Sequence, residues 1–490
     1  MIPYTLALFY SLTSVQNNAI RQQFITIISK TLSLPNKIVD VVWKYVAGDA
    51  LDILRDPKSL VTNELYNRSI STGVGVGFFS FKPVMYVFST NKQLVMKIAE
   101  YGDRGQEDIH ARDDFAIIES ALRYKTVVNL TGESASKERM MLKNHISGDS
   151  ILKDLMQQAN EFLNNYLRNS WNENSSLQDQ ISYLTTNIVA RNFLGIPHVP
   201  MEYIPLIQRL SALIDQGNPK SEEFKQVVAQ LRDIDIQLLR ESRDEIIRSG
   251  KYISDHLHIK EMDTDQTIDE KLNNIPSVST LILQDNLTAT INMAIAQIAK
   301  SEEIRSSLLD EINGIKDISQ LKPEELCYLP HLHAIYCETL RFLSPTAIIV
   351  RKTSKSLSFH VNEQQEILIA PQSRLFIPIR RIHHDRRYWE HPEKFDPTRF
   401  LKCKKPDYFM PFSLGKRSCP AGGTKYAEVL FKVFIVSIFS QYELSIDQEL
   451  EVIPQESTYP RWQNPYYAKI EPIPNKLQTG SFSRSPLEID

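Results

Sequence analysis

The pattern of apolar and polar residues predicts long helices in the middle of the chain and strands on either side. Apolar positions recur at helical spacing through most of residues 136–256, and again at 277–300 and 331–343. Residues 73–90 and 346–378 instead hold alternating stretches rich in Val, Ile and Phe, which is typical of paired strands. We therefore predict a fold that is mostly α with a minor β-sheet.

No repeat and no Gly/Ser or Pro linker divides the middle of the chain, so we expect one large domain over residues 71–473. Residues 1–70 form an N-terminal segment, and residues 474–490 form a polar C-terminal tail. The opening MIPYTLALFYSLTSVQNN has an apolar run of about a dozen residues, whereas a bilayer span needs roughly 20. It also lacks the basic region and cleavage site of a signal peptide. We expect a cytoplasmic protein without a transmembrane span, with at most peripheral membrane contact.

Composition, charge and glycine spacing argue against a nucleic-acid partner and a dinucleotide-binding site. Hydrophobic residues make up 42% of the chain and charged residues 23%, which are ordinary values for a globular protein. The net charge of −3 gives no bias toward nucleic acid, so we expect no nucleic-acid partner. Gly73, Gly75 and Gly77 form G-x-G-x-G, which lacks the spacing and the following helix of a dinucleotide site.

The cysteines are too few for a disulfide scaffold, and none forms a C-x-x-C pair. They are Cys327, Cys337, Cys403 and Cys419. Each is by default a reduced thiol, and a thiol becomes a metal ligand only where its surroundings favour the thiolate. The local sequence around each cysteine therefore decides its role.

Cys419 has surroundings that favour an anion. It is followed by the small-residue turn at 420–423 and then by an apolar helical pattern, so its sulfur precedes a helix N-terminus. The positive end of the helix dipole and the free amides there stabilise a thiolate and lower the pKa of the thiol. A buried structural cysteine on a helix-capping loop is the alternative interpretation.

This loop resembles the haem-binding loop of the cytochrome P450 family, F-x-x-G-x-R-x-C-x-[G/A]. Phe412, Gly415, Arg417 and Cys419 match the motif, while Ala421 stands where Gly is commoner. The resemblance implies that Cys419 ligates the haem iron, with Phe412 beside the sulfur and Gly415 turning the backbone under the ring. Arg417 would meet a haem propionate. A thiolate ligand suits oxygen chemistry because it favours cleavage of the O–O bond.

Two further segments match the family in order and spacing. ETLRFLSPTAIIVR (338–351) resembles its E-x-x-R helix, and WEHPEKFDPTRF (389–400) resembles its P-x-R-F segment. The resemblance implies a structural cluster of Glu338, Arg341 and Arg399.

The resemblance also implies partners for the haem propionates, namely Arg351, Arg417 and His383. GESASKERMMLKNHIS (132–147) resembles the family's W-x-x-x-R helix, with Arg139 as a further haem-binding residue. Ala135 replaces the Trp of that motif. We expect the cofactor to be haem b, because the chain has no C-x-x-C-H for covalent attachment.

The family's oxygen-handling motif, [AG]-G-x-[DE]-T, is altered in this chain. The downstream sequence IAKSEEIRSSLLDEI sets the register and places the motif at residues 282–286. Asp285 keeps the acid, but Asn286 replaces the Thr and Leu283 replaces the Gly. An amide both donates and accepts hydrogen bonds, so Asn286 is able to order the water that a Thr hydroxyl would hold. A shift of register by two residues would give that role to Thr288.

These features favour a monooxygenase that inserts one oxygen atom of dioxygen into a small apolar organic substrate. Asp285 and Asn286 would manage distal protons and water, and by resemblance Pro345–Val350 would line the pocket. Electrons would come from a separate reductase, flavodoxin-like or ferredoxin-like protein attracted by lysines around the cysteine loop. These lysines are Lys402, Lys404, Lys405, Lys416, Lys425 and Lys432.

Two alternatives stay open at this point. The first is a haem-thiolate isomerase, dehydratase or peroxygenase that acts on a peroxide without an electron donor. The departures at Leu283 and Asn286 favour it. The second is a haem-binding protein without catalysis.

Overall fold

The computed structural model describes the following residues: 74–79, 84–89, 94–96, 98, 109–111, 132–216, 221–249, 258, 264, 266–267, 279–315, 317–353, 355–362, 365–369, 373–401, 405–415, 418–423, 425–446, 454–455, 461–462 and 464–474. The chain forms two compact units whose segments alternate along the sequence. One unit comprises residues 1–113, 348–381 and 414–417, and the other comprises residues 114–347, 382–413 and 418–490.

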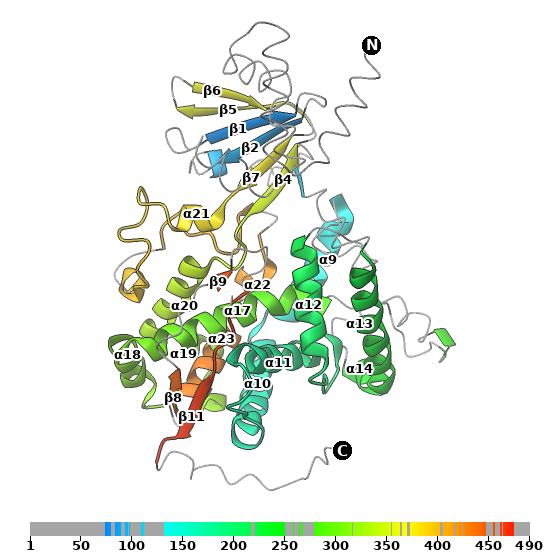
Figure 1. Ribbon diagram of the computed structural model, residues 1–490, viewed down its shortest axis with the longest axis vertical. Coiled ribbons are helices and arrows are strands. Elements are labelled where there is room, and N and C mark those ends of the chain that lie inside the picture. The colour runs from blue at the N-terminus through cyan, green and yellow to red at the C-terminus, as the bar shows by residue number, and fades with distance from the viewer. Residues whose placement is uncertain are drawn as a thin grey trace, which may run out of the picture. The chain divides into compact units, whose positions relative to one another are not determined.

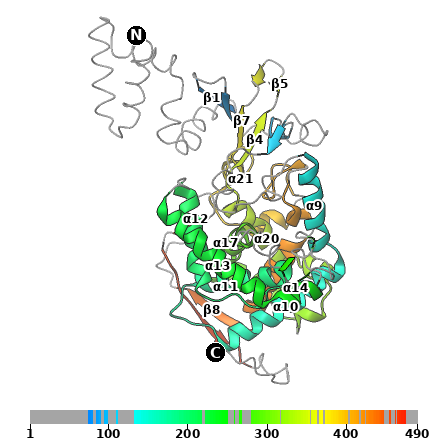
Figure 2. The ribbon, with the colours of Figure 1, turned by 90° about the vertical axis from the view of Figure 1, so that its right-hand side faces the viewer.

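The larger unit is helical (Figures 1 and 2). Its α-helices are α9 (Gly132–Ile146), α10 (Asp149–Asn169), α11 (Leu177–Val189), α12 (Tyr203–Gln216), α13 (Glu222–Glu241), α14 (Arg243–Ser249), α17 (Ser279–Lys300), α18 (Glu302–Ile312), α19 (Pro323–Cys327), α20 (Pro330–Leu343), α22 (Pro420–Gly423) and α23 (Tyr426–Phe439). Its other helical turns are the π-helix Ala190–Leu194 and the 3-10 helices Ile318–Gln320 and Pro397–Phe400. Two antiparallel strand pairs complete it: β8 (Tyr442–Ile446) with β11 (Ala468–Pro472), and β9 (Pro454–Gln455) with β10 (Arg461–Trp462).

Local sequence signals start several of these helices. The side chains of Ser176, Ser221 and Ser301 accept hydrogen bonds from backbone N–H groups in the first turns of α11, α13 and α18. Such N-caps satisfy amides that have no partner within the helix. Helix α20 begins with Pro330, whose missing N–H costs nothing there, and ends at Ser344 in the left-handed conformation.

The core of this unit surrounds α23, in which every residue from Val429 to Phe439 is buried. Apart from Lys432 and Ser437 these residues are apolar on all sides of the helix, which is typical of a helix inside a protein. α23 packs against α10, α17 and α20, while α17 also packs against α11. Both ribbon views place α17 in the middle of the unit with α20 beside it (Figures 1 and 2). This packing fixes α17 and α23, the two helices next to the predicted functional residues.

The smaller unit contains a five-stranded sheet in the order β1-β2-β7-β4-β3. Its strands are β1 (Val74–Phe79), β2 (Val84–Ser89), β3 (Ile109–Ala111), β4 (Ile349–Thr353) and β7 (Arg374–Ile377). β1 and β2 form an antiparallel pair, β2 and β7 are parallel, and the other pairs are antiparallel. β5 (Leu357–Asn362) and β6 (Gln365–Ile369) form a separate antiparallel pair. The short helix α21 (Ile379–His383) contains residues of both units.

The predicted fold class, mostly α with a minor sheet, is confirmed. The helices expected at 277–300 and 331–343 are α17 and α20, and the strands expected at 73–90 and 346–378 are β1, β2 and β4–β7. Among the described residues, no helix is both long enough and apolar enough to cross a bilayer. The N-terminal segment and residues 475–490 lie outside the described residues, so the predicted domain boundaries stay predictions.

Candidate functional site

The cysteine loop is closed by its own backbone. The N–H of Cys419 donates to the carbonyl oxygen of Phe412 at 2.8 Å, and the N–H of Ser413 donates to Met410 at 3.0 Å. Ser413 and Gly415 have φ angles of 64° and 69°, in the left-handed region that favours glycine. The tight turn predicted at Gly415 is therefore present. α22 begins directly after Cys419, and Phe412 packs against the core.

The described cysteines differ in their access to solvent. Cys419 is exposed, Cys337 is buried and Cys327 is half-buried. Burial raises the pKa of both the Cys327 and the Cys337 thiol to about 11, so these two sulfurs stay protonated at neutral pH. Cys403 lies outside the described residues. Among the described cysteines, Cys419 is the one placed to present its sulfur to a ligand.

Helix α9 lies against the cysteine loop. The guanidinium of Arg139 donates a hydrogen bond to the carbonyl oxygen of Ser418, the residue before the cysteine, and α9 also contacts α22. Ala135, at the position of the family's Trp, is buried. Arg351 is half-buried within β4, and Arg417 lies outside the described residues. The haem-binding roles of these three arginines stay predictions.

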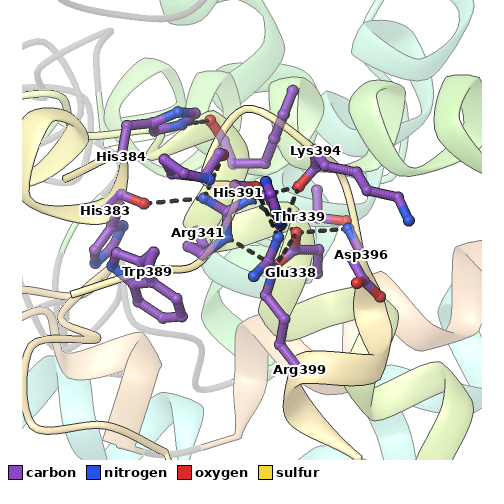
Figure 3. Close-up of polar contacts among 12 residues, drawn as sticks. Glu338, Thr339, Arg341, His383, His384, Trp389, His391, Lys394, Asp396 and Arg399 are labelled. Carbon is purple, nitrogen blue, oxygen red and sulfur yellow. Dashed lines mark hydrogen bonds and ion pairs between the residues drawn. The ribbon is translucent and has the colours of Figure 1, made fainter. Parts of the chain in front are cut away.

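Glu338 and Arg341, three residues apart on α20, form a fully buried ion pair (Figure 3). Two guanidinium nitrogens of Arg341 donate to the two carboxylate oxygens of Glu338, each at 2.8 Å. Arg399 completes the group, with its Nε 3.5 Å from Oε1 of Glu338. Burial raises the pKa of the Glu338 carboxyl, and the two guanidinium groups oppose that shift. The predicted cluster is thus present.

The same arginines hold the segment that follows α21. Arg341 donates to the carbonyl oxygens of His383 and Pro392, each at 2.9 Å, and Arg399 donates to that of His391 at 2.8 Å. The backbone N–H of Asp396 donates to Glu338 at 2.7 Å. One buried ion pair therefore fixes the backbone of residues 383–396 against α20, which supports a structural role for the cluster.

The prediction that His383 binds a haem propionate is wrong, because both of its ring nitrogens are already engaged. Its Nε2 accepts the N–H of Met410 at 3.0 Å, so Nδ1 carries the proton and donates to the hydroxyl of Ser344 at 2.8 Å. The ring is fully buried, and burial together with the Arg341 charge lowers its pKa to about 3. A neutral and fully bonded imidazole has no charge or N–H group left for a propionate.

Helix α17 presents the predicted distal residues. The carboxylate of Asp285 accepts a hydrogen bond from the hydroxyl of Ser211 on α12. The Oδ1 atom of Asn286 is buried and has no hydrogen-bond partner among the described residues. Buried polar atoms rarely stay unsatisfied, so such an atom points to a water or a ligand. The side chain of Leu283 lies outside the described residues.

Thr288, the alternative to Asn286, has a side chain that contacts another helix. Its hydroxyl lies 2.6 Å from that of Thr185 on α11, so the pair joins two packed helices. This contact favours the register in which Asn286 takes the position of the family's Thr.

The proposed lysine patch needs one correction. Lys405 and Lys425 are exposed, but Lys432 is fully buried and pairs with Glu428 at 3.0 Å. Lys432 therefore cannot attract an electron donor at the surface. The remaining three lysines lie outside the described residues. Two further contacts, Ser211 with Asp285 and His333 with Glu428, were not predicted from the sequence. Both join residues far apart in the chain, and no local pattern marks either of them.

Comparison with known proteins shows which family the chain belongs to. The family model described as Cytochrome P450 matches residues 79–469. The chain belongs to the cytochrome P450 family. P450 proteins are haem-thiolate oxidoreductases, and this membership confirms the resemblance carried by the loop of Cys419.

The curated P450 relatives match over part of their length. Cytochrome P450 3A56 of Fundulus heteroclitus is 31% identical over 160 residues, covering 32% of this chain and 31% of that protein. Probable cytochrome P450 6a13 of Drosophila melanogaster is 24% identical over 174 residues, or 34% of each chain. The 3,9-dihydroxypterocarpan 6A-monooxygenase of Glycine max is 27% identical over 169 residues, covering 33% of this chain and 32% of that protein. The matched stretches span about a third of these relatives.

A solved P450 shares the fold. The retinoic acid-bound cyanobacterial CYP120A1 superposes with a TM-score of 0.69 at 16% sequence identity, covering 87% of this chain and 97% of that chain. At this identity the likeness concerns the fold alone.

The described residues fit a haem held through one thiolate. The exposed Cys419 provides the sulfur, and the loop before it is closed by the bond to Phe412. The buried and unpartnered Oδ1 of Asn286 provides a hydrogen-bonding atom that the protein itself does not use.

Proposed function

We propose that this P450 is a monooxygenase that inserts one oxygen atom of dioxygen into a small apolar organic substrate. Its cofactor would be haem b, bound without a covalent link to the chain. A separate electron-transfer protein would supply the electrons, and the protein would work in the cytoplasm or at a membrane surface. The observation that carries this proposal is the exposed Cys419 on a closed loop that matches the family's ligand motif.

The residues of this chain would share the work as follows. Cys419 would hold the iron through its thiolate, and bound haem supplies dioxygen reduction and oxygen transfer. Arg139 lies beside the cysteine loop, where a guanidinium suits a propionate carboxylate. Arg351 and Arg417 are proposed for the same task. Pro345–Val350 would contribute to the substrate pocket.

Proton handling would fall to Asp285 and Asn286. The amide of Asn286 has a free carbonyl oxygen, which is able to accept a hydrogen bond from a water. Asp285, one residue earlier, is able to exchange a proton with that water and is held by Ser211. The pair would thus deliver protons in place of the family's acid and Thr.

Lys405 and Lys425 are exposed near the cysteine loop in the sequence and are candidates for binding an acidic electron donor. Complementary charge of this kind mainly raises the rate of association, so donor reduction of the enzyme should slow at high ionic strength.

The replacement of Thr by Asn at 286 supports a second candidate. A haem-thiolate isomerase, dehydratase or peroxygenase takes its oxygen from an existing peroxide and does not reduce dioxygen, and family members that rearrange or dehydrate a peroxide often lack the Thr. Such an enzyme would act without an electron donor.

One experiment separates these functions. Haem-loaded protein is given a panel of apolar substrates, either with a reductase and isotopically labelled dioxygen or with a hydroperoxide and no reductase. We expect labelled product that depends on the reductase. Turnover with the hydroperoxide but none with the reductase and dioxygen would contradict the monooxygenase proposal. No turnover in either arm would favour a haem-binding protein without catalysis.

A further inference from the structure

A largely buried group of polar side chains lies between α20 and the first turns of α23, just after the cysteine loop. Glu428 stands nine residues beyond Cys419, and its side chain is 15% exposed. Its Oε1 lies 2.6 Å from Nδ1 of His333 on α20 and 3.0 Å from Nζ of Lys432 on α23. We call Glu428, His333 and Lys432 the Glu428 network.

Lys432 is the most deeply buried member, with its side chain 0% exposed. Besides Glu428, its ammonium contacts the carbonyl oxygens of Leu326 at 3.2 Å and Cys327 at 2.9 Å. These carbonyls end α19, where a helix leaves its last C=O groups without internal partners. An ammonium has three N–H donors, so all of its hydrogen bonds are made. Lys432 thereby joins the end of α19 to α23.

Glu428 is ionised in this network. Burial alone raises its pKa, but the hydrogen bond from His333 and the charge of Lys432 together lower it to about 2. A carboxylate only accepts hydrogen bonds, so Nδ1 of His333 carries the proton that faces it. Nε2 then faces the thiol of Cys337 at 3.5 Å. Within the network, the Glu428 carboxylate is thus held between the imidazole of His333 and the ammonium of Lys432.

The network is within electrostatic reach of the cysteine loop. α22, which begins directly after Cys419, contacts α23 near its start. Tyr336 on α20 is fully buried; burial raises its pKa well above the usual value, and both Glu428 and Cys419 add to that rise. Cys327 and Cys337 also sense the charge of Glu428, and burial raises the pKa of both thiols to about 11, while a hydrogen bond with Lys405 opposes the rise at Cys337.

We infer that the Glu428 network fixes the start of α23 next to the loop of Cys419 and pairs a buried anion with a buried cation there, so that it tunes the reduction potential of a haem bound at Cys419. This inference rests on the proposed haem-thiolate function. A buried ion pair is costly to form, and a hydrophobic pair would serve stability as well. A buried charge, by contrast, acts over a longer distance than an exposed one because the interior screens it little.

The test is the ferric–ferrous reduction potential of the haem-loaded protein and its variants. In Glu428→Gln, an isosteric change, the cation of Lys432 is left uncompensated and should stabilise the added electron, which raises the potential. In Lys432→Met, the anion of Glu428 is left uncompensated and the potential should fall. The double variant Glu428→Gln/Lys432→Met restores neutrality and should return the potential toward that of the wild type.

A matched control is available on α9. Glu133 and Lys137 form an ion pair at 2.9 Å with the same i, i+4 spacing, but their side chains are 80% and 71% exposed. Lys137→Met should leave the potential unchanged, because solvent screens that pair. Potentials that stay at the wild-type value, or that move in the same direction in both single variants, would overturn the inference. If Lys432→Met does not fold, the sign of the Glu428→Gln shift decides.

A second measurement distinguishes an error in the inference about the Glu428 network from an error in the proposed haem-thiolate function. Each protein is first reduced under carbon monoxide, and its spectrum shows whether a thiolate ligates the iron. Wild-type protein without a thiolate spectrum would count against the proposed function. A normal thiolate spectrum combined with unchanged potentials would count against the network alone.

Discussion

At the scale of single residues, burial decides what His383 and Lys432 are able to do. Both are basic side chains near motifs that bind haem or an electron donor in the family, and both are 0% exposed. Desolvation favours a neutral imidazole, so His383 links Ser344 and Met410 through one hydrogen bond from each ring nitrogen. Lys432 instead pairs with the carboxylate of Glu428 at 3.0 Å. Residue type alone does not distinguish these outcomes.

The burial of His383 predicts a dependence of stability on pH. Its pKa is about 3 in the fold and about 6.5 in an unfolded chain, so between these values the unfolded state binds the extra proton. The free energy of unfolding should therefore fall as pH decreases below about 6.5, by roughly 1.4 kcal/mol per pH unit from this residue. Denaturant unfolding between pH 7 and 5 should show a shallower slope for His383→Gln. An identical slope in both proteins would contradict the assignment.

At the scale of elements, the ion pair of Glu338 and Arg341 joins α20 to residues 383–396. Removing one partner of such a buried pair leaves an unpaired charge in the interior. Arg341→Met should therefore lower the free energy of unfolding by about 3–5 kcal/mol, measured by denaturant titration. The control is Arg386→Met, since Arg386 is 82% exposed and lies 3.7 Å from Glu393. It should change stability by less than about 0.5 kcal/mol. Equal losses in the two variants would refute the structural role.

Asn286 and Thr288 on α17 have different expected roles. Asn286→Thr should raise the fraction of electrons that end in product, because a hydroxyl would replace the amide at the water-holding position. Thr288→Val removes the contact with Thr185 and should lower stability by about 1 kcal/mol without changing that fraction. The fraction is measured as product formed per electron donor consumed, and the stability by denaturant titration. No gain, or a loss, in Asn286→Thr would argue against the assigned register.

At the scale of the whole molecule, the sequence predicts the fold class, the family and the Glu338 cluster, because each leaves a local signature. E-x-x-R at helical spacing, P-x-R-F and the cysteine loop combine residue types at set separations. The contacts of His383 with Met410, Asp285 with Ser211 and Glu428 with His333 span 27, 74 and 95 residues and depend on how the helices pack. No local pattern records such packing. The roles of Arg351 and Arg417 remain predictions.

The central claim is that the thiolate of Cys419 ligates the haem iron. The most direct test is the absorption spectrum of the reduced protein under carbon monoxide, compared between wild type and Cys419→Ala. We expect the wild type to show the long-wavelength band of a haem-thiolate, and Cys419→Ala to lose it. A wild type that takes up no haem, or a Cys419→Ala protein with an unchanged spectrum, would contradict the account.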